Sequence, residues 1–92
     1  MDDFDAEEWA EMQKMYITHT SKELVKIQED IDNIAMDFLK TFGHNIKGSG
    51  GMYGFEEVTS LGTEIEASAK ANDRGKIKLL LEELSTFLKT KI

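Results

Sequence analysis

The chain contains no cysteine and no proline among its 92 residues. The lack of cysteine excludes a disulfide framework and a thiolate metal site, and the lack of proline leaves long helices uninterrupted. No apolar run approaches the roughly 20 residues needed to span a bilayer, and the amino terminus has neither the basic start nor the apolar core of a secretory signal. We therefore expect a soluble protein, not attached to a membrane, in the reducing environment of the cytoplasm.

Acidic residues outnumber basic ones, with 18 aspartates and glutamates against 11 lysines and arginines, so the formal net charge is -7. Affinity for a phosphate backbone depends on clustered lysine and arginine, so nucleic acid is not expected as a partner. The stretch between Asp37 and Glu56 contains no acidic residue. That stretch holds Lys40, His44 and Lys47. This neutral-to-basic patch could accept a single phosphoryl group without a general attraction for polyanions.

Helical spacing runs through the whole sequence. Apolar residues recur three and four positions apart, and the sustained alternation typical of strands is missing, which favours an all-α protein. The predicted segments cover about residues 6–30, 32–53 and 55–70, and a last one that follows a turn and N-cap at 72–73 and runs to about Lys89. Because the connections are short, we expect an antiparallel up-and-down four-helix bundle, with room for an N-terminal helical extension. The small size predicts one domain over the whole chain, residues 1–92.

The first segment allows two interpretations. Thr20 followed by Glu23 resembles a capping box, which would divide the segment into two helices. One continuous helix fits the apolar spacing as well.

His44 lies off the apolar stripe of the second segment. Phe42 and Ile46, which belong to that stripe, are two positions away on either side, roughly 160° around the helix in opposite senses. The imidazole is therefore expected to point away from the core. The residues within about 60° of it on the same helical face are all basic or small: Lys40, Thr41, Lys47, Gly48 and Gly51.

The glycines on this face lower helix stability by roughly 1 kcal/mol each relative to alanine. For Gly48 and Gly51, the compensating gain that we infer is close access of another protein's surface to the imidazole. Close packing of helix backbones and a flexible loop are the alternatives, and Gly50 fits the first of them. A nucleotide-binding loop is excluded, because the run lacks a Gly-Lys-Ser/Thr ending and follows no strand. His19 has no second ligand at metal-binding spacing, so no metal site is expected.

A nucleophilic imidazole needs one ring nitrogen with a free lone pair, and a carboxylate that accepts the proton of the other nitrogen would fix that tautomer. If the chain folds back at Gly54, the level of His44 is matched about ten to twelve residues after the turn. Glu64 and Glu66 lie there. Glu66 is the better candidate because it flanks the core position Ile65, and a solvated surface charge is the alternative interpretation.

A longer pattern carries a family resemblance. It consists of three pieces in order: His44-x-x-Lys47-Gly48-Ser49, then Gly54-Phe55, then Leu61-x-x-x-Ile65-Glu66. From about Ile34 to Leu88 the chain closely resembles the histidine phosphotransfer (HPt) domain of multistep two-component phosphorelays.

The resemblance implies a four-helix bundle in which His44 is the phosphorylated residue. It further implies that Lys47 neutralises the phosphoryl oxygens, that Gly48 leaves room for the partner, and that Glu66 hydrogen-bonds the second ring nitrogen. The partners implied are response-regulator receiver domains, a hybrid histidine kinase, or both. Mg²⁺ is expected on the receiver domain and no cofactor on this chain, which we expect to be a monomer. The double glycine Gly50-Gly51 departs from many members and places the end of the second helix in doubt.

The function predicted on these grounds is that of a phosphoryl carrier without turnover of its own. His44 would accept a phosphoryl group from a receiver phosphoaspartate or a kinase and pass it to another receiver domain. Tyr16 or Ile17 of the first segment would add to the docking surface, together with Lys40, Thr41, Gly48 and Gly51. Three alternatives stay open: a non-phosphorylated helical interaction bundle, an enzyme with a His44-Glu66 dyad as general base, and the phosphoacceptor domain of a larger histidine kinase.

Overall fold

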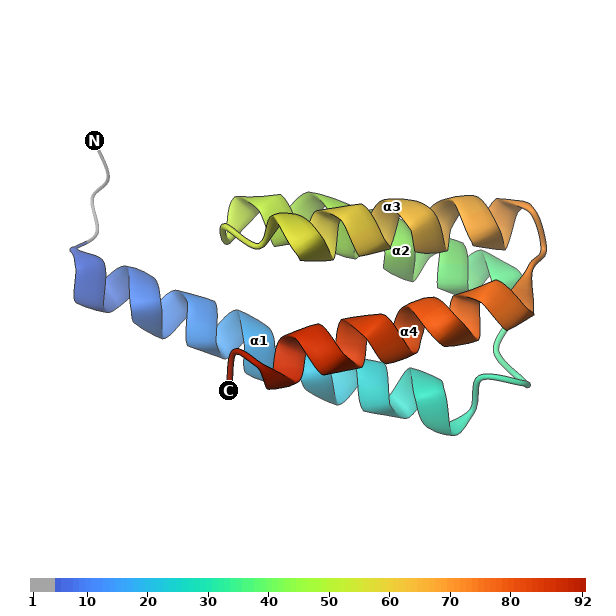
Figure 1. The fold of residues 1–92 in the computed structure, drawn as a ribbon, viewed down its shortest axis with the longest axis horizontal. Helices are drawn as coiled ribbons and strands as arrows, with labels where there is room; N and C mark the ends of the chain where they lie inside the picture. The colour runs from blue at the N-terminus through green and yellow to red at the C-terminus, as the bar shows by residue number, and fades with distance from the viewer. Residues whose placement is uncertain (1–4) are drawn as a thin grey trace.

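The computed structural model describes residues 5–92, and this part of the chain forms helices without any strand. The four helices are α1 (Ala6–Glu29), α2 (Met36–Met52), α3 (Glu56–Lys70) and α4 (Arg74–Lys89). The chain reverses direction at each connection, and the first turns of α1 project beyond the ends of the other helices (Figure 1). The all-α, antiparallel up-and-down bundle predicted from the sequence is therefore confirmed, and α1 itself supplies the amino-terminal extension.

α1 is one continuous helix, so the division at Thr20 is wrong. The capping box lies instead at the start of the helix, where the Glu8 amide donates to Asp5 Oδ1 at 2.8 Å and the Asp5 amide donates to Glu8 Oε1 at 3.2 Å. Thr20 is buried in the middle of the helix and belongs to the core.

α2 begins at Met36, four residues later than the predicted start near Asp32. The reason lies in a distant residue. The Arg74 guanidinium donates to the carbonyl oxygens of Ile31 at 2.6 Å and Ile34 at 2.7 Å. These contacts hold the segment before Met36 in a turn, and Ala35, the N-cap residue, is extended with φ -65 and ψ 145, so the helix begins after it.

The carboxyl end of α2 lies where Gly54 predicts it. The helix continues through Gly50 and Gly51 to Met52, so the double glycine does not end it early. Gly54 adopts φ +84, a left-handed conformation that favours glycine. The Phe55 amide then donates to the Gly50 carbonyl at 2.7 Å, which closes the turn into α3.

The core runs along the bundle axis between the four helices. Its fully or nearly fully buried apolar side chains are Ile17, Leu24, Ile27, Leu39, Phe42, Ile46, Val58, Leu61, Ile65, Ala69, Ile77, Leu80, Leu81, Leu84 and Leu88. Each buried leucine or isoleucine contributes about 1.5–3 kcal/mol relative to an exposed one. α3 and α4 supply nine of these fifteen side chains, and therefore the larger part of the buried core.

An aromatic cluster fixes α1 against the carboxyl end of α2. The Tyr53 ring stacks on Tyr16 at a centroid distance of 4.6 Å and on Trp9 at 6.3 Å. Gln13 Nε2 donates to the Tyr53 carbonyl at 2.8 Å, and the Tyr16 hydroxyl lies 2.8 Å from Ser49 Oγ. Partial burial raises the pKa of Tyr16. Because Ser49 follows Gly48 in sequence, this contact attaches α1 close to the exposed face that carries His44.

Candidate functional site

The candidate site is built on the hairpin of α2 and α3. His44 and Lys47 come from the middle of α2, and Glu66 comes from the third turn of α3. Thr59 of α3 donates its hydroxyl to the Lys47 carbonyl at 2.8 Å, which joins the two helices beside the site. Antiparallel pairing places Glu66 level with His44, as the residue counting from Gly54 predicts.

His44 is exposed and makes one side-chain contact within the described part of the chain. Its Nδ1 lies 3.2 Å from Glu66 Oε2, and 64% of the imidazole side chain is exposed against 14% of Glu66. Because a carboxylate only accepts hydrogen bonds, this contact places the ring proton on Nδ1 and the free lone pair on Nε2. Glu64, the other carboxylate near this level, is exposed and has no ion pair among the described residues.

The Glu66 carboxylate also binds cations. Lys47 Nζ lies 3.0 Å from Oε1, and Lys70 Nζ lies 4.0 Å from Oε2. The pKa of Glu66 is lowered, chiefly by the Lys47 hydrogen bond and against the opposing effect of burial, with smaller contributions from the Lys47 charge, the His44 hydrogen bond and the Lys70 charge. The carboxylate therefore stays ionised and keeps its contact with the imidazole at neutral pH.

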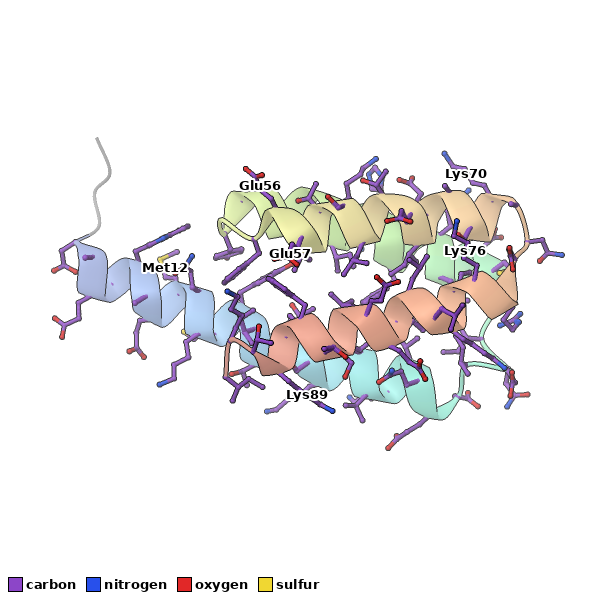
Figure 2. The ribbon with its side chains drawn as sticks, in the orientation of Figure 1. Met12, Glu56, Glu57, Lys70, Lys76 and Lys89 are labelled. Atoms are coloured by element: carbon purple, nitrogen blue, oxygen red, sulfur yellow. The ribbon has the colours of Figure 1, made fainter. Side chains whose placement is uncertain are left out.

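Lys70 was not among the residues predicted from the sequence. It lies one helical turn after Glu66, and a lysine four residues after a glutamate is the usual signal for such an ion pair. Its side chain points outward from the carboxyl end of α3, away from α4 (Figure 2). It adds a second positive charge beside Glu66.

The predicted partner-binding residues are all exposed: Lys40, Thr41, Gly48 and Gly51. A Cβ atom at Gly48 would meet no described atom within 4 Å, and one at Gly51 would lie 3.2 Å from Thr59 Oγ1. The helix surface beside the imidazole is thus open. Gly50 is buried against Val58, in agreement with its interpretation as a packing residue.

The first helix contributes to this face differently from the prediction. Ile17 is only 2% exposed and belongs to the core, so it cannot contact a partner. Tyr16 is half-buried. The docking surface predicted from the sequence did not include two exposed methionines, Met15 of α1 and Met52 of α2, which have 68% and 72% of their surface accessible. Met15 immediately precedes Tyr16 and Met52 immediately precedes Tyr53, so both methionines lie at the end of the bundle that holds the Tyr16–Tyr53 stack.

Two other features of the described residues bear on function. No group of three or more histidine, cysteine, aspartate or glutamate side chains among residues 5–92 could hold a metal ion. No described helix is both long and apolar enough to cross a membrane.

Comparison with known families decides the assignment. A family model, that of the Hpt domain, matches residues 11–90. The chain belongs to the Hpt domain family. No curated protein and no solved structure shows significant similarity to it. As an Hpt domain it has a phosphotransfer role in two-component signalling, belongs to a class of phosphoryl carriers, and interacts with receiver domains or kinases.

Proposed function

We propose that this Hpt domain accepts a phosphoryl group on His44 Nε2 from the phosphoaspartate of one receiver domain and passes it to the aspartate of another. The observation that carries this proposal is the Glu66 contact at His44 Nδ1, 3.2 Å long, on an imidazole that is otherwise exposed. A fixed Nδ1–H tautomer leaves Nε2 as the nucleophile. The open surface at Gly48 gives a bulky phosphoryl donor access to it.

The transfer step is a displacement at phosphorus. The Nε2 lone pair forms the N–P bond while the bond between phosphorus and the aspartate oxygen breaks, and the electron pair of that bond leaves with the aspartate carboxylate. The proton stays on Nδ1, so the ring becomes positively charged. Glu66, which faces that proton, stabilises the charge. The same step in reverse loads the second receiver domain.

Lys47 balances the charge of the phosphoryl group. An ammonium carries three N–H donors, so Lys47 can keep one on Glu66 and offer the others to phosphoryl oxygens. A bound phosphoryl group adds up to about two negative charges near neutral pH. Lys70, 4.0 Å from Glu66, limits the repulsion between that carboxylate and the phosphoryl group.

The partner docks, in this proposal, on the exposed face around His44. Lys40, Thr41, Gly48 and Gly51 form its centre, and Met15 and Met52 lie toward the end held by the aromatic cluster. Methionine side chains adapt to different surfaces, which suits a carrier that binds more than one partner. The receiver domain supplies the Mg²⁺ that activates its aspartate, and this chain acts as a monomer without a cofactor of its own.

Phosphotransfer profiling tests the proposal. The purified protein is incubated with receiver domains of the source genome that carry labelled phosphate, and in a separate arm with a histidine kinase and labelled ATP. We expect an adduct that is labile in acid and stable in alkali, at no more than one phosphoryl group per chain. His44→Gln should abolish it, and His19→Gln, the matched control at the other histidine, should retain it.

Three results would count against the proposal. Label that persists in His44→Gln would place the phosphoryl group elsewhere. A lack of label from every receiver and from the kinase would favour the interaction bundle without phosphorylation. Continuous release of product from a small substrate, with all receivers removed, would favour the His44-Glu66 dyad enzyme. Light scattering of the protein as it elutes from a size-exclusion column measures its mass and checks that it is a monomer.

A further inference from the structure

The backbones of α2 and α3 meet directly beside the site, at Gly43 and Gly62. A Cβ atom on Gly43 would lie 2.7 Å from the Glu66 amide nitrogen and 2.9 Å from the Gly62 carbonyl oxygen. A Cβ atom on Gly62 would lie 2.6 Å from the Lys47 amide nitrogen and 2.7 Å from the Gly43 carbonyl oxygen. Because these neighbours are backbone atoms, no change of rotamer could make room for a side chain.

This contact involves the backbones of Glu66 and Lys47 and of the residue that precedes His44. Gly43 precedes His44 and meets Glu66, and Gly62 meets Lys47. Interior glycines weaken a helix relative to alanine, so two of them at one crossing need a compensating gain. Helices whose side chains interdigitate normally lie 8–10 Å apart. Glycine at the crossing permits a closer approach.

The hydrogen bond between His44 and Glu66 depends on that approach. Its length of 3.2 Å is at the long end of the range for a nitrogen-to-oxygen hydrogen bond. An ordinary contact to carbon needs about 3.5 Å, so a methyl group at Gly43, where only 2.7 Å is available, requires α3 to move by roughly 0.8 Å. The Nδ1 to Oε2 distance then grows to about 4 Å, at which the hydrogen bond is lost.

We propose that Gly43 and Gly62 are positioning residues for phosphotransfer, because their contact sets the helix spacing at which the Glu66 carboxylate reaches the His44 imidazole. The proposal rests on the role of His44 as the phosphoacceptor. The long, flexible Lys47 side chain can follow a small shift of α3, whereas the shorter imidazole cannot. Wider spacing therefore breaks the imidazole contact first and leaves the Lys47–Glu66 ion pair.

Gly50 provides a matched control. It is also a buried glycine of α2 that packs on α3, since its Cβ atom would lie 2.8 Å from Val58 Cβ and 2.9 Å from the Thr59 amide nitrogen. It lies six residues, or more than one and a half turns, after His44. Gly50→Ala should therefore cost stability in the same way without separating Glu66 from the imidazole.

A stabilised background allows all variants to be compared as folded proteins. Gly75 is exposed in the first turn of α4, and among the described atoms a Cβ atom there would meet only Asp73 Oδ1, at an ordinary contact distance of 3.8 Å. Gly75→Ala should raise helix stability without affecting α2 or α3. Gly43→Ala, Gly62→Ala and Gly50→Ala are each made in this background, and circular dichroism checks that they fold.

Two readouts separate a positioning role from a structural one. Nitrogen-15 NMR of the His44 ring gives the ratio of its two neutral tautomers, and labelled phosphate gives the rate of transfer from a receiver that loads the parent protein. In Gly43→Ala and Gly62→Ala we expect the tautomer ratio to fall by about fivefold or more, with a comparable fall in the transfer rate. Gly50→Ala should stay within about twofold of the parent.

Three outcomes would overturn the inference: an unchanged tautomer ratio in Gly43→Ala, an equal change in Gly50→Ala, or complete unfolding of both the Gly43 and the Gly62 variants in the stabilised background. Glu66→Asp, which draws the carboxylate back without altering helix packing, should reproduce the loss of the tautomer preference. If the parent itself takes no label on His44, the proposed function fails, whereas the tautomer ratios still show whether the glycines set the spacing.

Discussion

Replacing Gly48 with alanine should stabilise the bundle and slow phosphotransfer at the same time. Gly48 lies inside α2, and a Cβ atom there would meet no described atom within 4 Å. The change therefore adds helix propensity, about 1 kcal/mol, without a packing cost. For a domain of this size, 1 kcal/mol corresponds to a rise in Tm of about 4–8 °C.

Thermal unfolding followed by far-UV circular dichroism measures the gain. Gly51→Ala is the matched control on the same face, and we expect a smaller rise in Tm because its Cβ atom would lie 3.2 Å from Thr59 Oγ1. Transfer rates from a labelled receiver are measured on the same samples. Gly48→Gln, with a longer side chain beside the imidazole, should slow transfer by roughly tenfold or more.

The combination of results decides between packing and access as the reason for a glycine at this position. If Gly48→Ala lowers Tm, the glycine serves packing and the open surface described above has no role. If Gly48→Gln folds and transfers at the wild-type rate, the partner does not approach His44 across this part of α2. A more stable but slower variant would support the access argument, because unfolding cannot explain the slower rate.

Three further predictions concern stability. The pKa of Glu66 is lowered, chiefly by the Lys47 hydrogen bond. Its contribution to stability is therefore present above the ordinary carboxyl pKa of about 4.3 and is lost as the pH falls through the lower folded value. In urea titrations, the difference in unfolding free energy between wild type and Glu66→Gln should shrink toward zero as the pH is lowered from neutral through that folded value. Arg74→Met removes both hydrogen bonds to the loop before α2 and should lower the free energy of unfolding by about 2 kcal/mol. The control Lys76→Met, at an exposed position, should lower it by less than about 0.5 kcal/mol. Equal losses in the two variants would show that Arg74 does not stabilise the loop. Leu84→Ala, at a position with no exposed surface, should lower the free energy of unfolding by about 2–5 kcal/mol. The control is Leu79→Ala, at an exposed position of the same helix. A small loss of stability in Leu84→Ala would contradict the assignment of Leu84 to the core.

The sequence predicts those parts of this protein that depend on local spacing. The carboxyl end of α2 follows from Gly54, whose positive φ is the conformation that glycine adopts readily. The level of Glu66 opposite His44 follows from counting 1.5 Å per residue on both sides of that turn. Neither result needs knowledge of the other two helices.

The features that were missed depend on residues far apart in the chain. The start of α2 is set by Arg74, which is 43 residues from Ile31, and no local pattern reveals that contact. Ile17 is buried because α1 packs on α4, and its place on the helix alone did not distinguish it from the exposed Met15. The closeness of Gly43 and Gly62 becomes visible only once α2 and α3 are paired, although glycine inside a predicted helix is a signal that a close backbone approach is worth testing.

The stack of Trp9 on Tyr53, at a centroid distance of 6.3 Å, gives this protein an intrinsic optical probe. Trp9 is the only tryptophan in the chain, so its fluorescence reports a single location. That location is joined through Tyr53 and Tyr16 to Ser49, the residue that follows Gly48. A partner that displaces α1 as it binds would change the emission, and the kinetics of association could be followed with the unlabelled protein.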